Sequence, residues 1–346
     1  MALPQTLPSS RVPDPADAPG LRWGILGPGW IAGAFALAVR THTRQQLTAV
    51  GSRNLVRAEE FAARHGIAHA HGSYEELVAD PQVDAIYVAT PHSEHAEHAL
   101  LAIEAGKHVL VEKAFTRNAD EARRVVDAAR RKGVGLMEAM WTRFLPRIDI
   151  VRQLLDDGAL GELELVVADH GQSLGHVRRL IDPNLAGGGL LDLGVYPISF
   201  ASFALGAPAT VHSAGELTPA GVDRQVSAIF SGYEEHPHAQ ALVSCTIAAK
   251  TPTTAVIAGD RARIELDGDF YAPGPVRLVF PDGQSLTAPS APIAGHQGLA
   301  HEAAHFAQLI SDGFTESPQL GLDETVSIME TLDLIRAQRG VRFPGE

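Results

Sequence analysis

The sequence predicts an α/β protein of two domains: a doubly wound parallel sheet, followed by an α+β domain on a mostly antiparallel open sheet. The first domain is predicted over residues 21–138, where short apolar runs alternate with amphipathic stretches of helical period. The second is predicted over residues 139–346, where strand-like runs follow one another with turns between them. Residues 1–20 contain five prolines and no apolar stretch typical of a signal peptide, so a flexible tail is expected there.

Strands and helices are predicted to alternate through the first domain. Continuous apolar strands separated by amphipathic helices are typical of a parallel sheet covered on both faces. The predicted strands are 23–26, 47–53, 84–89, 108–111 and 134–137, and the predicted helices are 31–39, 56–65, 74–78, 94–105 and 120–131.

The second domain is predicted to be a sheet covered by three helices. Its predicted strands are 163–168, 210–212, 225–230, 240–247, 254–258, 262–266 and 276–280, and its predicted helices are 191–205, 300–309 and 323–338. The cleft between the two domains is the expected substrate site, because ligands bind preferentially where domains meet.

A glycine-rich turn follows the first predicted strand. Gly27, Gly29 and Ala32 have the Gly-x-Gly-x-x-Ala spacing of a dinucleotide-binding Rossmann fold. Gly27 allows the tight turn, Gly29 lets the backbone approach a pyrophosphate, and Ala32 lets the helix pack closely on the sheet. The phosphates are expected at the helix N-terminus, beside Trp30 and Ile31. Spacing alone is a weak signal, because glycine-rich turns are common.

The end of the second strand distinguishes between the two nicotinamide cofactors. An NAD-binding fold usually places an acid on the ribose 2′-hydroxyl about twenty residues after the glycine motif. Here Ser52 and Arg53 stand at that point, and Arg57 follows one helical turn later. A hydroxyl and two guanidinium groups suit a 2′-phosphate, so NADP is the predicted cofactor. The alternative is that both arginines are ordinary exposed residues at a helix start.

Composition argues against several classes of partner. A net charge of −13 is unlike that of a nucleic-acid-binding protein. No apolar run approaches the ~20 residues that a membrane span requires. The single cysteine, Cys245, excludes an intramolecular disulfide and fits a cytoplasmic location. It falls in a strand-like run, so a buried, inert thiol is expected.

Five segments resemble a known family. Residues 89–95 and 106–113 resemble the Gfo/Idh/MocA oxidoreductases, and residues 137–146, 187–197 and 340–344 resemble their subgroup of dimeric dihydrodiol dehydrogenases and NADP-dependent D-xylose dehydrogenases. The resemblance covers the chain after residue 21. It implies hydride transfer between NADP and a small molecule, a sugar or vicinal diol. An aldose such as D-xylose, oxidised at C1, is the first expectation, and a trans-dihydrodiol is the alternative.

Lys113 follows an apolar strand and is expected at the carboxyl edge of the parallel sheet. There its ammonium can hold the nicotinamide ribose or favour alkoxide character at the reacting oxygen. The alternative is a surface ion pair with Glu112. The usual Glu-Lys-Pro of the resembled family is Glu112-Lys113-Ala114 here. A cis bond at this place is therefore expected to be lost, because a non-proline cis peptide costs about 2.5–4 kcal/mol.

Asp192 and Tyr196 are the other expected catalytic residues. They lie four residues apart on one predicted helix, so their side chains share a face. A phenol can act as general acid–base, and an ammonium such as that of Lys113 favours its phenolate form. Asp192 can accept a hydrogen bond from a substrate hydroxyl or orient Lys113. The resemblance implies these same roles; without it, a dipole-complementing carboxylate and a core tyrosine are the alternative.

Further residues are expected to contact cofactor or substrate. His92 and His95 follow a buried strand at the edge where nicotinamide binds, and Trp141 can stack on a sugar ring or an arene. Arg179 is expected to reach substrate hydroxyls. The remaining expected cofactor contacts are Thr90, Pro91, Glu112 and Arg143.

The sequence also has features of two other function classes. His301, Glu302 and His305 fit the His-Glu-x-x-His pattern of zinc hydrolases, but no third ligand has the expected spacing and no metal is expected. A non-catalytic NADP(H)-binding regulator is disfavoured by the presence of Lys113 and Tyr196. A homodimer is expected, joined through the apolar outer face of the second sheet at residues 241–244.

Overall fold

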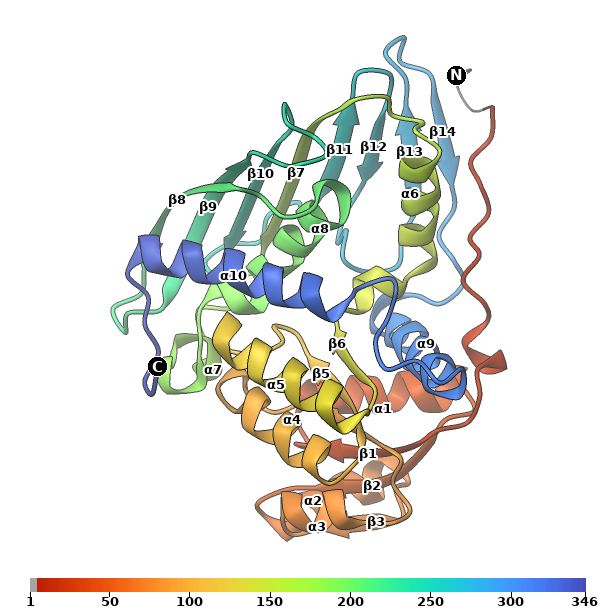
Figure 1. The fold of residues 1–346 in the computed structure, drawn as a ribbon, viewed down its shortest axis with the longest axis vertical. Coiled ribbons are helices and arrows are strands. Elements are labelled where there is room, and N and C mark those ends of the chain that lie inside the picture. The colour runs from red at the N-terminus through yellow and green to blue at the C-terminus, as the bar shows by residue number, and fades with distance from the viewer. Residues whose placement is uncertain (1–4) are drawn as a thin grey trace. The chain divides into compact units, whose positions relative to one another are not determined.

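A computed structural model describes residues 5–346, and they divide into two compact units (Figure 1). What we call the first unit consists of Pro13–Phe144 and Gly295–Val326. The second unit consists of Leu145–Ala294 and Ser327–Glu346, together with the described residues up to Val12.

The first unit is built on a parallel six-stranded sheet of order β3-β2-β1-β4-β5-β6. This is the predicted doubly wound sheet, with apolar strands such as β4 buried at every residue. The strands are β1 Arg22–Leu26, β2 Gln46–Gly51, β3 His69–His71, β4 Ala85–Val88, β5 His108–Glu112 and β6 Leu136–Ala139. The α-helices are α1 Trp30–His42, α2 Leu55–His65, α3 Tyr74–Ala79, α4 His95–Glu104, α5 Ala119–Lys132 and α9 Leu299–Ser311. Short helical turns are η1 Pro15–Asp17, η2 His92–Glu94, η3 Trp141–Phe144 and η6 Gly295–Gly298.

The second unit is built on an eight-stranded sheet of order β14-β13-β12-β11-β7-β10-β9-β8. Its neighbours are antiparallel except β7 and β10, which confirms the mostly antiparallel sheet. The strands are β7 Leu163–Gly171, β8 Thr210–Leu217, β9 Asp223–Ser231, β10 Gln240–Thr246, β11 Ala255–Gly259, β12 Arg263–Leu266, β13 Val276–Val279 and β14 Ser285–Ala288. The helices are α6 Pro146–Asp156, α7 Arg178–Ile181, η4 Pro183–Leu185, the π-helical turn η5 Leu190–Gly194 and α8 Val195–Leu205; α10 Leu322–Arg339 begins in the first unit and continues into the second. Helix α8 packs on β7 and β10 (Figure 1).

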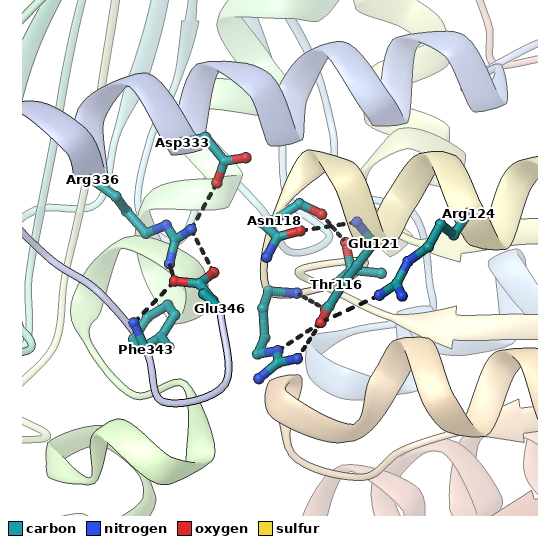
Figure 2. A network of polar contacts seen from close by, with 9 residues as sticks. Thr116, Asn118, Glu121, Arg124, Asp333, Arg336, Phe343 and Glu346 are labelled. Atoms are coloured by element: carbon teal, nitrogen blue, oxygen red, sulfur yellow. Dashed lines mark hydrogen bonds and ion pairs between the residues drawn. The ribbon is translucent and has the colours of Figure 1, made fainter.

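Two polar clusters hold element ends within their own units (Figure 2). In the first unit, Asn118 caps α5 by accepting a hydrogen bond from the Glu121 N–H at 2.9 Å. In the second unit, the Arg336 guanidinium donates to Asp333 at 2.9 Å and to both carboxylate oxygens of Glu346 at 2.8 and 3.1 Å. The same guanidinium lies 4.7 Å from the ring centroid of Phe343, so the closing segment of the chain is fixed on α10.

Two expectations need correction: the flexible tail at the N-terminus and the assignment of α9 to the second domain. Residues 5–20 are not a free tail: Arg11 pairs with Asp149 at 2.7 Å, and Gln153 donates to the Ser9 carbonyl at 2.9 Å. The first unit also takes α9 from the region assigned to the second domain. The reason is burial, because the Phe306 ring of α9 lies 5.5 Å from the fully buried Trp23 of β1.

One segment contradicts the expectation that no apolar run approaches the length of a membrane span. By length and composition, residues 183–205 are long and apolar enough to cross a membrane. No other helix of residues 5–346 is. Since 89% of the apolar window is buried, the segment has the character of a core helix.

Candidate active site

The glycine-rich turn after β1 has the geometry that its sequence predicts. Gly27 has a φ of +97°, and a Cβ added there would lie 2.8 Å from Thr90 Cγ2. Gly29 begins α1 without any side-chain cap, and the nearest atom to an added Cβ is the Ala89 carbonyl oxygen at 3.8 Å. Ala32 is fully buried against the sheet. The N–H groups of the first turn of α1, including those of Trp30 and Ile31, therefore remain available to an anion such as a pyrophosphate.

The arginines expected at the 2′-phosphate lie on the surface at the end of β2. Ser52 is buried, and Asn54 caps α2 by accepting from the Arg57 N–H at 3.3 Å. The Arg53 side chain is 73% exposed and pairs with Glu94 at 3.3 Å. Arg57 is exposed on the first turn of α2. Both guanidinium groups can therefore reach an anion, but Glu94 competes for Arg53.

The turn at Lys113 corrects the expectation of a lost cis bond. The peptide bond between Lys113 and Ala114 is cis although the second residue is alanine. The carbonyls on both sides of this turn are held, since His92 Nε2 lies 3.2 Å from the Lys113 oxygen and His95 Nδ1 lies 2.9 Å from the Ala114 oxygen. These two rings, expected on the cofactor, thus have contacts to the backbone that presents Lys113.

Burial beside this turn affects the ionisation of a polar side chain. Burial lowers the pKa of His95 to about 4, so its ring is neutral near pH 7 and donates to only one of its two carbonyl neighbours, Ala114 or Thr90. The buried Glu112 accepts a hydrogen bond from the Tyr87 hydroxyl and another, at 3.1 Å, from the Lys113 N–H. Glu112 is therefore held inside the unit and braces the turn.

Trp141 lies in a ring cluster that includes a residue the sequence reasoning did not assign. Trp141 is buried, and His296 stacks on it with centroids 5.7 Å apart. His296 also contacts Trp30 edge-on, with ring centroids 5.0 Å apart. Trp30 is 72% exposed. The sequence predicts no role for His296, because no local pattern links it to either tryptophan. Arg143, expected on the cofactor, is buried and donates to Glu324 instead.

In the second unit, the structure brings together the polar residues predicted for substrate. The Arg179 guanidinium of α7 lies 3.0 Å from Asp192 Oδ1 of η5. Asp192 is buried, whereas the Arg179 side chain is 47% exposed. Tyr196 follows in the first turn of α8 and is also buried. The result is a carboxylate held by a cation, four residues from a phenol.

Tyr196 is flanked by rings that sequence reasoning missed. His170 of β7 lies 5.2 Å from the Tyr196 ring and stacks on Tyr271 at 4.4 Å, and Tyr271 lies 4.8 Å from Tyr196. Gln172 Nε2 lies 2.9 Å from His170 Nε2. Burial raises the pKa of Tyr271 to about 12, so it stays a neutral phenol at any working pH. His170 and Gln172 lie about 100 residues before Tyr271 in the chain, so only the folded structure brings them together.

A buried carboxylate begins the helix that carries Asp192 and Tyr196. Asp223 Oδ2 accepts a hydrogen bond from the Leu190 N–H at 2.6 Å. Gly188 has a φ of +115°, and a Cβ added there would lie 2.2 Å from Asp223 Oδ1. Burial raises the pKa of Asp223 to about 6. Asp223 therefore positions the start of η5 without belonging to any motif.

The zinc-hydrolase pattern lacks the geometry of a metal site. His305 Nε2 lies 2.9 Å from Ser317 Oγ, and its ring stacks on Phe144. In the described part of the chain, His301, Glu302 and His305 do not form a group whose ligand atoms lie within 4.8 Å of one another. Burial, followed by the charge of Glu112, raises the pKa of Glu302 well above its usual value. The motif is thus a buried stretch of α9.

Family models match both parts of the chain. Residues 21–140 match the oxidoreductase family with an NAD-binding Rossmann fold, and residues 148–265 match the Gfo/Idh/MocA C-terminal domain. A trans-1,2-dihydrobenzene-1,2-diol dehydrogenase of Bos taurus is 37% identical over 333 residues, which cover 94% of this chain and 98% of that protein. The human protein of the same name is 36% identical with the same coverage.

Solved structures are similar over nearly the whole chain. A 3-ketoreductase from Actinomadura kijaniata, in complex with TDP-benzene and NADP, has a TM-score of 0.77 at 27% identity, covering 92% of this chain and 97% of that one. An NAD binding oxidoreductase from Klebsiella pneumoniae has a TM-score of 0.81 at 24% identity, with coverage of 92% and 96%. The chain belongs to the Gfo/Idh/MocA oxidoreductase family and is a dehydrogenase acting on CH–OH groups.

Proposed function

We propose that this dehydrogenase oxidises a vicinal diol with NADP⁺. The observation that carries the proposal is the arrangement of Asp192, Arg179 and Tyr196, a paired carboxylate and guanidinium beside a phenol. Such groups can bind one hydroxyl of a diol while the other loses its proton. A nicotinamide cofactor held at the glycine-rich turn of Gly27 and Gly29 would supply the acceptor for the hydride.

In this proposal each residue has a defined role in the reaction. Tyr196, as its phenolate, accepts the hydroxyl proton while the carbon loses hydride, so the CH–OH group becomes a carbonyl. Lys113 supplies positive charge to the reacting oxygen and favours the phenolate. Asp192, held by Arg179, orients the neighbouring hydroxyl. His92 and His95 act through the Lys113 turn and are positioning residues.

Trans-dihydrodiols are the first substrate class that we propose. Relatives with more than a third of their residues identical have that name. The rings of His170 and Tyr271 around Tyr196 also suit the face of an unsaturated six-membered ring. This reverses the order of the sequence-based expectation. Aldoses such as D-xylose remain the second candidate, because the Arg179–Asp192 pair offers both donors and acceptors to several hydroxyls.

A substrate panel tests the proposal directly. Absorbance at 340 nm is followed with trans-1,2-dihydrobenzene-1,2-diol, D-xylose and a monohydric alcohol, each with NADP⁺ and with NAD⁺. We expect the highest kcat/KM for the dihydrodiol with NADP⁺ and no turnover of the monohydric alcohol. Binding of NADP⁺ without turnover of any diol or aldose would instead favour the regulator hypothesis.

We also propose that the chain forms a homodimer through the open face of the eight-stranded sheet. Ile229, Leu242 and Val167 are paired across β9, β10 and β7 and are 46%, 38% and 39% exposed. A stripe of exposed aliphatic side chains in register favours a cover by a second copy. Light scattering at micromolar concentration should give twice the chain mass, and Leu242→Glu should give the monomer. Leu334→Glu, at an exposed leucine of α10, is the control and should leave the mass unchanged.

A further inference from the structure

A second group of potential ligands lies at the edge of the parallel sheet. His69 Nδ1 and His71 Nε2 lie 2.8 and 3.0 Å from the same oxygen, Oδ2 of Asp80. All three ligand atoms lie within 4.8 Å of one another, and no other group of three His, Cys, Asp or Glu side chains in residues 5–346 meets that criterion. None of the three residues belongs to the glycine turn, the Lys113 turn or the Tyr196 cluster.

The local fold explains why these side chains converge. His69 and His71 are the two ends of the short edge strand β3, and residues two apart on a strand face the same side. Asp80 follows the last residue of α3, the helix that comes next in the chain. The imidazoles are part-exposed, with side-chain exposures of 35% and 23%, whereas Asp80 is 5% exposed. The cluster is therefore open on the imidazole side and closed behind the carboxylate.

Asp80 is held in place by contacts that leave Oδ2 to the histidines. Its Oδ1 accepts a hydrogen bond from the Gln82 N–H at 2.8 Å, and its carbonyl accepts from Lys107 Nζ at 2.8 Å. Burial opposes its charge, but hydrogen bonds from His69, Gln82 and His71 lower the pKa of Asp80 to about 2. A carboxylate oriented by these contacts beside two imidazoles is the donor set that zinc takes in proteins.

We propose that His69, His71 and Asp80 bind one divalent transition-metal ion of the zinc type. The ligands are His69 Nδ1, His71 Nε2 and Asp80 Oδ2, with water completing a tetrahedral shell. Metal–ligand bonds of about 2.0–2.1 Å place ligand atoms about 3.3 Å apart, so each histidine nitrogen would lie about half an ångström or less farther from Asp80 Oδ2 than it does here. In the metal complex neither His69 Nδ1 nor His71 Nε2 carries a proton, so the ion replaces the two hydrogen bonds to Asp80.

The competing interpretation is that both histidines only hydrogen-bond Asp80. The two interpretations differ in what a metal ion does. A ligand site saturates at one ion per chain and clamps β3 to the end of α3, which raises the unfolding temperature because the ion binds only the folded state. A purely hydrogen-bonded cluster gives neither effect.

The test uses the full chain, stripped with EDTA and titrated with Zn²⁺ against a chromophoric chelator at pH 7.5. We expect one equivalent to bind with micromolar or tighter affinity and to raise the unfolding temperature. The double variant His69→Gln, His71→Gln should lose at least about 100-fold in affinity and the thermal shift, since two of three ligands are removed. Its dehydrogenase activity should be retained, which also shows that it folds.

The matched control is His212→Gln, which removes an exposed strand histidine of β8 in the other unit. It should bind Zn²⁺ as the parent does. Equal affinity in the parent and the double variant, or binding of Zn²⁺ in the parent only at millimolar concentration, would overturn the site. Asp80→Asn provides a second measurement: the affinity should fall because an amide is a poorer zinc ligand than a carboxylate.

Discussion

Two helices of this molecule begin after glycine-rich turns, and they use their N-termini differently. Gly29 begins α1, and no side chain caps it. Gly189 begins η5, and there the Asp223 carboxylate accepts from the Leu190 N–H at 2.6 Å. The first N-terminus is open to an anionic ligand, whereas the second already holds an anion of the protein. A glycine-rich sequence alone therefore does not identify a phosphate site. The helix N-terminus must also be free of a side chain of the protein that already accepts from its N–H groups.

The largest expected effect is a loss of kcat without a loss of cofactor affinity. It tests whether Tyr196, after η5, serves the chemical step while the N-terminus of α1 serves cofactor binding. Tyr196→Phe removes the proton acceptor and should lower kcat by about 10²–10⁴-fold. The dissociation constant for NADP⁺, measured by fluorescence titration, should stay unchanged. The control is Tyr233→Phe, because the hydroxyl of Tyr233 is buried and has no hydrogen-bond partner among the described residues. Equal losses in the two variants would contradict the assignment.

Lys113→Met extends this prediction to the other unit. Loss of the ammonium should lower kcat by an amount comparable to that of Tyr196→Phe. NADP⁺ should still bind through its phosphates, so binding and turnover separate in steady-state kinetics. A Lys113→Met enzyme with parental kcat would remove Lys113 from the mechanism.

The carboxylate at η5 should make stability depend on pH. Burial raises the pKa of Asp223 from its usual 3.8 to about 6, so the folded chain binds this proton more tightly than the unfolded chain. The stability contributed by that proton is complete below pH 4 and is lost as the pH rises to 6. The shift corresponds to about 3 kcal/mol. The unfolding free energy of the parent minus that of Asp223→Asn should fall by about this amount between pH 4 and pH 7.

Paired glycine variants sharpen the contrast between the two turns. Gly188→Ala should destabilise the protein by at least about 2 kcal/mol, because φ is positive and the new Cβ would meet Asp223. Gly29→Ala should leave the unfolding temperature nearly unchanged, because the space beside it is open. Its effect should be a weaker affinity for NADP⁺, since a methyl group blocks the close approach of phosphate. Urea unfolding and cofactor titration of both variants decide between these outcomes.

The smallest expected effect concerns cofactor choice. Arg53→Asp should weaken NADP⁺ binding by about 10- to 100-fold, as one charge-assisted contact is lost, and should shift preference toward NAD⁺. Arg64→Asp, at an exposed arginine near the end of α2, makes the same charge change and should leave the preference unchanged. NAD⁺ bound as tightly as NADP⁺ by the parent enzyme would contradict the role of Arg53.

Much of the fold was predictable because it depends on local patterns. The apolar strands and amphipathic helices of the parallel sheet lie within a few residues of their predicted ends. The strand β3, His-Ala-His, was missed because it has no apolar run, and α6 was missed because Pro146 at its first position was not used as a helix signal. Helix α9 was predicted, but its unit was not, because packing on Trp23 is a tertiary effect.

The candidate site was predictable where motifs carry it and not where it depends on distant contacts. The sequence indicated Lys113, Asp192 and Tyr196, and their roles remain predictions. It could not indicate His296 beside Trp141, nor Asp223 at Leu190, because each pair is more than thirty residues apart in the chain. Nor could it indicate that His95, expected on the cofactor, is buried and lies 2.9 Å from the Ala114 oxygen.

The return of residues 295–326 to the first unit affects how this chain folds during synthesis. Trp23 is made near the beginning, but the Phe306 ring that packs on it is made almost three hundred residues later. A nascent chain that ends at residue 144 therefore exposes part of the surface that α9 covers. The nucleotide-binding unit reaches its final packing only after residues 295–326 have left the ribosome. The other unit also needs Ser327–Glu346, so neither unit is complete before nearly the whole chain has been made.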